Sequence, residues 1–331
     1  MINKIAYIET DQTIPYHNLA LEEQLLKNVE VGQCILYLWQ NKQTVVIGHN
    51  QNAWKECQVS KLLEDGGYLV RRLSGGGAVF HDMGNLNFTF LVRKEDYDLN
   101  KQLDVILKAV QKLGLHAEKS GRNDILVDGK KFSGNAYFET EGHCYHHGTI
   151  MVNVNLPELS KYLSVSKDKL VSKGVDSVQS RVMNLSQANP DITIEKLKGA
   201  LQEAFSEVYK CKLEILDESL LDQPVIEERA NYFSSWDTIF GKKITFQHEI
   251  ERRFEWGNMQ LQMEISKGMI QELNVFSDAL VPWFMDQFAQ KLKGQKYQFD
   301  NMKVACEQVK PKSKQEECML QDIIALLKEM V

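Results

Sequence analysis

The densest chemical signal in the sequence is the stretch 71–82, where three consecutive glycines stand between an Arg-Arg pair and a His-Asp pair. Glycine has no Cβ, so the backbone there can take positive φ and bring its N–H groups close to phosphate or carboxylate oxygens. A flexible surface turn is the alternative, but such a turn does not call for these flanking charges. The stretch predicts a ligand-binding loop.

The spacing of the glycines excludes the commonest phosphate-binding motifs. No Gly-x4-Gly-Lys occurs, and the pattern beginning at Gly75 reaches Phe80 where a dinucleotide fingerprint needs glycine or alanine. The Gly-x-Ser-x-Gly motif of serine hydrolases and the His-Glu-x-x-His motif of zinc proteases are also absent from the sequence. The loop must therefore belong to another class of site.

A second polar cluster brings a carboxylate and lysines together in the segments 121–124 and 130–137. Activation of a carboxylic acid by a nucleotide needs a cation near the carboxylate and the α-phosphate, and a divalent metal held through one or two carboxylates. Lys131 and Asp124 have the chemistry for these two roles. A polar hairpin with solvated lysines remains the alternative.

Three histidines and Cys144 lie together in the segment 143–147, which suggests a metal site. Neighbouring residues of an alternating strand point to opposite faces, so we do not predict zinc there. The six cysteines of the chain include no Cys-x-x-Cys pair and are widely scattered. We predict reduced thiols, most of them packing residues.

The periodicity of apolar residues predicts the elements that position these clusters. Strands are expected at 5–8, 34–39, 44–47, 68–72, 88–92, 125–127, 131–139 and 149–154, and helices at 19–29, 54–64, 99–113 and 194–209. Asp128-Gly129 is the clearest hairpin signal, so the strands around it should be antiparallel. A hairpin about Lys267-Gly268, with strands 254–265 and 269–276 and helices at 282–292 and 316–330, predicts a small α+β appendage.

Size and charge set the broad class of protein. The chain has 331 residues, 43% of them hydrophobic and 25% charged, which predicts one large domain plus a smaller one. The polar stretch 217–228 indicates a boundary nearby, so we expect a large domain at 1–240 and an accessory domain at 241–331. The net charge of −6 disfavours nucleic acid and anionic membranes as partners. With no run of eighteen apolar residues and no signal-peptide core, we expect a cytoplasmic protein without membrane association.

Taken together, these blocks resemble the lipoate–protein ligase A family. Residues 71–82 match its Arg-Arg-x-Ser-Gly-Gly-Gly-Ala-Val-Phe/Tyr-His-Asp loop, and Gly121-Arg122-Asn123-Asp124 and Lys131-x-Ser133-Gly134-x-Ala136 match the next two blocks. Further matches lie at 18–23, 44–48, 51–52, 84–85, 147–149, 173–182 and 254–257. The resemblance covers nearly all of the chain.

The resemblance implies an α+β fold, with a mixed, mainly antiparallel sheet flanked by helices as in biotin ligases and class II synthetases, and a small C-terminal α+β domain. It implies an ATP-dependent ligase that converts lipoic acid to lipoyl-AMP, with Mg²⁺, and transfers the lipoyl group to a lysine of an acceptor protein. The acceptors would be lipoyl domains of E2 subunits or the glycine cleavage H protein.

The resemblance also assigns roles to residues. Arg72, Ser74, Gly75, Gly76, Gly77, His81 and Lys131 would bind lipoate or lipoyl-AMP, and Arg72, Gly77, Ala78, Val79, Phe80, Asn85, Asn123, Asp124 and Lys131 would bind ATP. Lys131 would be the catalytic residue that contacts the lipoate carboxyl and the α-phosphate. Asp124 would hold Mg²⁺.

The sequence departs from the family at His49 and Gln179, where relatives carry arginine, so each position lacks a fixed positive charge. An excess of basic residues between Lys161 and Arg181 suggests either an acceptor-docking surface or a solvated loop. Two rival functions remain: a related octanoyl or lipoyl transferase, for which Cys144 is the only nearby cysteine nucleophile, and a lipoate-binding protein without catalysis.

Overall fold

The computed structural model describes residues 1–120, 124–164, 182–241 and 248–330, which form two compact units. Unit 1 comprises Met1–Val46, Glu56–Arg71 and Val79–Ser235, and unit 2 comprises Ile47–Lys55, Arg72–Ala78 and Trp236–Val331. The glycine loop, residues 72–78, thus belongs to the same unit as the C-terminal part of the chain. The division into domains 1–240 and 241–331 stays a prediction.

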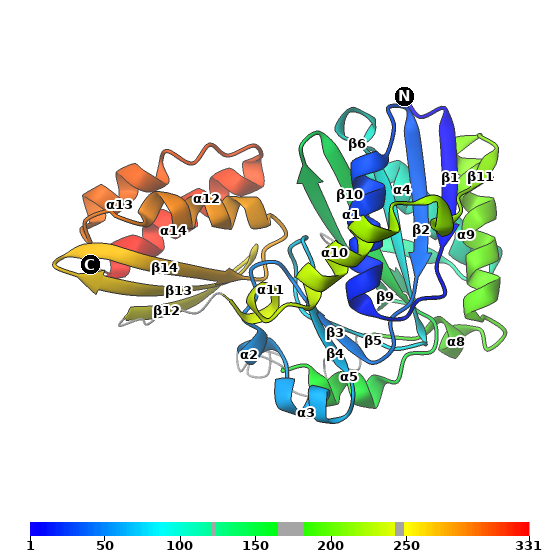
Figure 1. Cartoon of the computed structure of the whole chain (residues 1–331), viewed down its shortest axis with the longest axis horizontal. Coiled ribbons are helices and arrows are strands. Elements are labelled where there is room, and N and C mark those ends of the chain that lie inside the picture. The colour runs from blue at the N-terminus through cyan, green and yellow to red at the C-terminus, as the bar shows by residue number, and fades with distance from the viewer. Residues whose placement is uncertain (121–123, 165–181, 242–247, 331) are drawn as a thin grey trace. The chain divides into compact units, whose positions relative to one another are not determined.

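Unit 1 is built on an eight-stranded mixed sheet (Figure 1). Its order is β11 (Leu213–Ile215), β1 (Lys4–Glu9), β2 (Gln33–Trp39), β6 (Asn85–Arg93), β10 (His143–Met151), β9 (Lys130–Thr140), β8 (Asp124–Val127) and β7 (Ala117–Ser120). β1 runs parallel to β2 and β11, and the other neighbours are antiparallel. The predicted mixed, mainly antiparallel sheet is confirmed.

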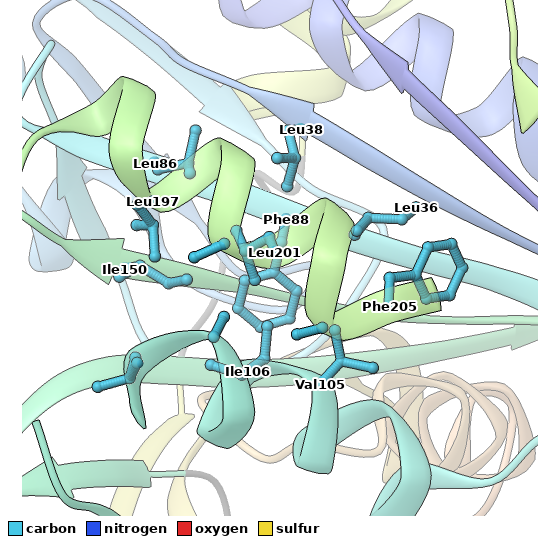
Figure 2. Packing of buried hydrophobic residues seen from close by; sticks show 14 of the residues in the cluster. Leu36, Leu38, Leu86, Phe88, Val105, Ile106, Ile150, Leu197, Leu201 and Phe205 are labelled. Atoms are coloured by element: carbon cyan, nitrogen blue, oxygen red, sulfur yellow. The ribbon is translucent and has the colours of Figure 1, made fainter. Parts of the chain in front are cut away.

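One face of this sheet carries the main core of unit 1. There α4 (Leu99–Lys112) and α9 (Ile194–Tyr209) pack on alternate residues of the central strands, and Figure 2 shows Phe88 surrounded by Leu36, Ile106 and Leu201. Each buried side chain of this size contributes about 1.5–3 kcal/mol relative to exposure. The residues between them on each strand must point to the opposite face.

The opposite face is covered by α1 (Pro15–Asn28), on which α10 (Gln223–Ser234) packs. Because helices lie on both faces, β2 is buried at every position and shows no exposed alternation. The helix α10 was not predicted, because its sequence is polar along most of its length. Arg229 of this helix donates two hydrogen bonds, of 2.9 and 2.7 Å, to the Glu23 carboxylate of α1.

A three-stranded sheet of β4 (Tyr68–Arg71), β3 (Thr44–Ile47) and β5 (Val79–His81) leads into and out of the glycine loop. The predicted helix 54–64 is wrong, because it is divided into α2 (Ala53–Glu56) and α3 (Val59–Glu64) where Cys57 forms a bridge to Leu163. The other short elements that the structure describes before α10 are α5 (Leu156–Tyr162), α8 (Leu185–Ala188) and the 3₁₀ turns Lys94–Asp96 and Glu218–Leu220.

Beyond α11 (Trp236–Phe240), unit 2 has its own sheet, with β12 (His248–Phe254), β13 (Gly257–Ser266) and β14 (Met269–Ser277) in antiparallel order. A separate apolar core joins this sheet to α12 (Pro282–Leu292), α13 (Phe299–Cys306) and α14 (Lys314–Met330). The hairpin at Lys267-Gly268 is confirmed, with φ of 51° and 72°. The predicted strand 254–265 is wrong, since a turn at Glu255-Trp256 divides it.

The helices of the described residues include none with both the length and the apolar composition needed to cross a membrane.

Candidate active site

Lys131 and Asp124 lie side by side at the start of β9 and β8. The Lys131 Nζ is 2.7 Å from the Asp124 Oδ1, and both side chains are about one-third exposed, at 34% and 36%. The register shifts between Ile125 and Leu126, so Phe132 is an extra residue on β9. This bulge places Lys131 on the same face as Asp124, with the charged pair open to solvent on one side.

The absence of a side chain at Gly134 leaves room for the Lys131 side chain. A Cβ added at Gly134 would lie 3.0 Å from the Lys131 Nζ and 3.1 Å from its Cε. The Gly134 N–H donates to the Thr149 Oγ1 at 3.3 Å, which fixes this hydroxyl beside the lysine. The Lys-x-Ser-Gly spacing is therefore explained by the structure. The glycine leaves room for the Lys131 side chain to extend along β9 over position 134.

Two asparagines of β6 extend this polar face of the sheet. Asn87 is paired with Thr149 across the β6–β10 ladder, and its Oδ1 accepts a hydrogen bond of 2.9 Å from the Asn85 Nδ2. Both side chains are 1% exposed, and the Asn87 Nδ2 has no hydrogen-bond partner among the described residues. An unpaired buried donor is costly without a ligand, so Asn87 joins the candidate site. The strict polar–apolar alternation of 85–90 was the signal that could have identified it.

Further along the same face, a buried carboxylate holds a polar network beneath α1. The Glu22 Oε1 accepts a hydrogen bond of 2.7 Å from the Thr89 hydroxyl and lies 2.9 Å from the His147 Nδ1. The Trp39 indole N–H donates to the Thr89 Oγ1 at 3.1 Å. Glu22 is 2% exposed and His147 7%, so this pair is shielded from water.

Replacing Glu22 by alanine should lower the free energy of unfolding by about 3 kcal/mol, because it leaves the His147 ring and the Thr89 hydroxyl buried without their acceptor. Urea denaturation followed by circular dichroism would measure the loss. Glu22→Gln, which keeps an acceptor oxygen of similar size, should cost less. An alanine variant as stable as the parent would contradict this account of the network.

The histidines of β10 alternate between the two faces, as predicted. His146 is fully buried on the core side, 2.8 Å from the Asn135 Oδ1, whereas His147 contacts Glu22 on the other side. Burial lowers the pKa of His146 to about 3, with His147 acting in the same direction, so this ring is neutral at pH 7. The predicted strand 149–154 is wrong in its bounds, since β10 already begins at His143.

In unit 2, the Arg72 guanidinium shapes the glycine loop. Its Nε donates to the Ser74 Oγ at 3.0 Å, and its Nη2 donates to the Gly75 and Gly77 carbonyls at 2.7 and 2.8 Å. Arg72 is 6% exposed and Ser74 is fully buried. The loop wraps around the Arg72 guanidinium. Carbonyl groups in a tight loop have no sheet partner, and the several N–H donors of the guanidinium satisfy them instead.

A side chain would meet different surroundings at each of the three glycines of the loop. A Cβ on Gly75 would lie 2.2 Å from the Ala279 carbonyl oxygen, and Gly76 has a φ of +90° that favours glycine. A Cβ on Gly77 would meet nothing within 4 Å. Within the described residues, the Gly77 N–H also makes no hydrogen bond. Gly77 thus combines open space around its Cα with a backbone N–H that can donate to a ligand.

The residues after the loop return to unit 1. Val79 is half-buried, whereas the Phe80 ring is 4% exposed and lies 5.5 Å from the Tyr162 ring between centroids. His81, 3% exposed, has its Nδ1 3.2 Å from the Asn41 Nδ2. Ala78 is half-buried at the end of the loop.

The other residues singled out in the sequence are either outside the described residues or paired with a carboxylate. Asn123 and Gln179 lie outside the described residues, as does most of the basic segment 161–181. Lys161 is described, and its Nζ is 2.5 Å from an Asp65 carboxylate oxygen. His49 lies in unit 2, its Nε2 3.0 Å from the Asp286 Oδ2. The structure thus joins Lys131 with Asp124 in unit 1, and Arg72 with the glycine loop in unit 2.

Comparison with known proteins identifies the family. Residues 14–206 match the model of the lipoyl protein ligase A/B catalytic domain, and residues 243–327 match that of the bacterial lipoate protein ligase C-terminus. A lipoate-protein ligase A of Psychrobacter cryohalolentis is 42% identical over 308 residues, which are 91% of each chain.

Solved structures agree. The crystal structure of P. falciparum LipL1 in complex with lipoate superposes with a TM-score of 0.86 at 30% identity, covering 98% of this chain and 99% of that one. A lipoate-protein ligase A bound with ATP gives a TM-score of 0.62 at 25% identity, covering 73% of this chain and 99% of the other. The bipartite lipoate protein ligase of Thermoplasma acidophilum gives 0.64 at 26% identity, covering 74% and 98%.

The chain is therefore a ligase, the class to which the matched family models and relatives belong. The chain belongs to the lipoate–protein ligase A family.

Proposed function

We propose that the chain activates free lipoic acid with ATP and transfers the lipoyl group to a lysine of an acceptor protein. In the first step the lipoate carboxylate attacks the α-phosphorus of ATP, which forms lipoyl-AMP and releases pyrophosphate. In the second step the ε-amine of the acceptor lysine attacks the lipoyl carbonyl, forms an amide and displaces AMP. The relatives bound to lipoate and to ATP support both small-molecule substrates.

The single observation that carries the proposal is the Lys131 ammonium group held at the surface of the sheet by Asp124. Two anions, the carboxylate and the α-phosphate, must approach each other before the first step. A cation about 4 Å away offsets their repulsion by about 4 kcal/mol at an effective dielectric constant of about 20. The same ammonium group stabilises charge on the phosphate as the bond to pyrophosphate breaks.

Asp124 fits the role of a magnesium ligand. Mg²⁺ bound to a nucleotide keeps most of its ligands as water and phosphate oxygens, and one or two protein carboxylates suffice. Asp124 is about one-third exposed beside Lys131, so one of its oxygens can face the metal. The ion would neutralise charge on the triphosphate, while Lys131 and the buried Asn85 and Asn87 amides orient the nucleotide.

The glycine loop contributes backbone donors and a fixed shape. With its carbonyls held by Arg72, the loop offers the half-buried Gly77 N–H as a donor for a phosphate or carboxylate oxygen. Ser74 lies within the loop against Arg72, and Ala78 and Val79 offer a half-buried apolar surface suited to adenine. Excluding water there would protect the mixed anhydride from hydrolysis.

Small lipoyl domains of E2 subunits and the H protein are the proposed acceptors. The Thermoplasma acidophilum structure, which includes a ligase and its E2 lipoyl domain, supports this class of partner. The decisive assay is intact mass spectrometry of such a domain after incubation with the chain, ATP, Mg²⁺ and lipoate. We expect one added lipoyl group and an equal amount of pyrophosphate. An unmodified acceptor with no pyrophosphate would overturn the proposal.

Cys144 provides the test against cysteine-based acyl transfer. Burial raises the pKa of its thiol to about 11, with Glu139 acting in the same direction, so roughly one molecule in ten thousand carries the thiolate at pH 7. We expect Cys144→Ala to retain its rate of acceptor lipoylation within about twofold. A loss of activity, together with a labelled Cys144 peptide after reaction with an octanoyl or lipoyl donor, would favour the transferase.

A further inference from the structure

The turn between β14 and α12 contacts the glycine loop directly within unit 2. The Ala279 carbonyl accepts a hydrogen bond of 3.1 Å from the Gly76 N–H, and the absent Cβ of Gly75 lets this carbonyl approach. Gly76 is the residue of the 72–78 loop that has positive φ. The hydrogen bond to Ala279 therefore holds the loop at its left-handed residue. The loop's shape therefore depends on where residues 277–279 lie.

Ser277 and Asp278 hold that turn in place. The Ser277 hydroxyl donates to the Asn258 carbonyl at 2.7 Å and accepts from the Ala279 N–H at 3.0 Å. The Asp278 carboxylate accepts from the Asn258 N–H at 2.5 Å and from the Arg253 Nη1 at 2.8 Å. Ser277 and Asp278 are thus both tied to Asn258 at the start of β13, and Ala279 is tied to Ser277.

Gly257 explains why this arrangement needs the sequence Phe254-x-Trp256-Gly257. It has a φ of +156°, and a Cβ there would lie 2.7 Å from the Asp278 Oδ1. The glycine therefore allows the carboxylate to reach the Asn258 N–H. The Trp256 indole N–H donates to the Asp322 Oδ2 at 2.8 Å, which anchors the β12–β13 turn to α14.

A second set of contacts ties the segment 48–51 to the same turn. The Ser277 N–H donates to the Asn50 carbonyl at 2.8 Å, and the Asn50 Nδ2 donates to the Pro282 carbonyl at 3.1 Å. The neighbouring His49 N–H donates to the Ser74 carbonyl at 2.9 Å. The turn is therefore connected to the glycine loop by two routes, one through Ala279 and one through Asn50.

From this geometry we infer that Ser277 and Asp278 are positioning residues for the ligase reaction, which set the glycine loop for lipoate through the Ala279 carbonyl and Asn50. The inference rests on the proposed function of the loop. It gives the 277–279 turn a role that neither the loop motif nor the lysine block of the sequence indicates.

Steady-state pyrophosphate release by the full chain tests the inference, with lipoate varied at saturating ATP, Mg²⁺ and acceptor domain. Ser277→Ala removes both hydroxyl contacts and is expected to raise the KM for lipoate about tenfold, with a much smaller change in kcat. Ser277→Thr keeps the hydroxyl and should restore most of the affinity. Ser266→Ala, at the exposed far end of β13, is the matched control and should behave as the parent chain.

The melting temperature separates positioning from stability. A merely structural Ser277 would lower the melting temperature but leave the KM of the folded enzyme unchanged when assayed well below that temperature, and this result would overturn the inference. Should Ser277→Ala fail to fold, Asp278→Asn provides the same test, with an expected rise in KM of about threefold. An inactive parent chain would instead contradict the proposed function itself.

Discussion

Replacing Lys131 with alanine is expected to slow acceptor lipoylation by about a hundredfold to a thousandfold. The loss arises because the ammonium group beside Asp124 offsets the repulsion between the carboxylate and the α-phosphate and stabilises charge in the transition state. Because the first step forms the adenylate that the second step consumes, pyrophosphate release should fall with lipoylation. Intact mass spectrometry of the acceptor, read at several times, gives the rate.

Lys130→Ala is the matched control for this prediction. Lys130 is the adjacent residue of the same type at the start of β9, and it is exposed. Its removal should change the rate by less than about twofold. Because the Lys131–Asp124 pair is one-third exposed, Lys131→Ala should also alter stability by less than about 1 kcal/mol. Equal rates for the two alanine variants would contradict the role of Lys131.

Substituting the loop glycines one at a time should separate folding from ligand binding. Gly77→Ala is expected to leave the melting temperature within about two degrees of the parent, since its Cβ would enter open space at a φ that other residues adopt. It should nevertheless weaken binding of lipoate by about tenfold to a hundredfold, because the methyl group would occupy the ligand's approach to the Gly77 N–H. Isothermal titration calorimetry with lipoate and a non-hydrolysable ATP analogue measures the effect.

Gly75→Ala supplies the contrast. Its Cβ would overlap the Ala279 carbonyl at 2.2 Å, so the loop and the 277–279 turn must move apart. We expect both a lower melting temperature, by about 2–4 °C for a loss of about 1 kcal/mol, and weaker binding. A Gly77→Ala variant that binds lipoate as tightly as the parent would show that the ligand does not approach this residue.

The two long helices that pack on the core face of the unit 1 sheet, α4 and α9, follow from the sequence because their apolar periodicity is regular. The helix α4 illustrates this: the apolar stripe and the stop at Gly114 are both confirmed, and the structure adds Asp98 as the N-cap. The predictions that are wrong fall where a tertiary contact overrides the local pattern. Cys57 pairs with Leu163 and interrupts the predicted helix 54–64, and the turn at Glu255-Trp256 depends on contacts with Asp278 and Asp322.

The candidate site is only partly readable from the sequence. Lys130 and Lys131 can be identified as candidates from their residue type. The bulge at Phe132, which turns Lys131 toward Asp124, depends on the β8–β9 pairing and cannot be predicted from the local sequence. Arg72 was expected to bind a ligand, which stays a prediction, and in the structure its guanidinium donates to the loop's own carbonyls. Ser277 and Asp278 carry no motif that links them to residues two hundred positions earlier, so their contact with the loop emerges only in three dimensions.

The position of Lys131 relative to the adenylate tests the account most directly. A crystal structure of the chain with a hydrolysis-resistant lipoyl-AMP analogue is predicted to place a phosphate oxygen or the adjoining lipoyl oxygen about 3 Å from the Lys131 Nζ. An analogue bound at full occupancy with Lys131 still paired only to Asp124, and no ligand oxygen within reach of its ammonium group, would contradict the account.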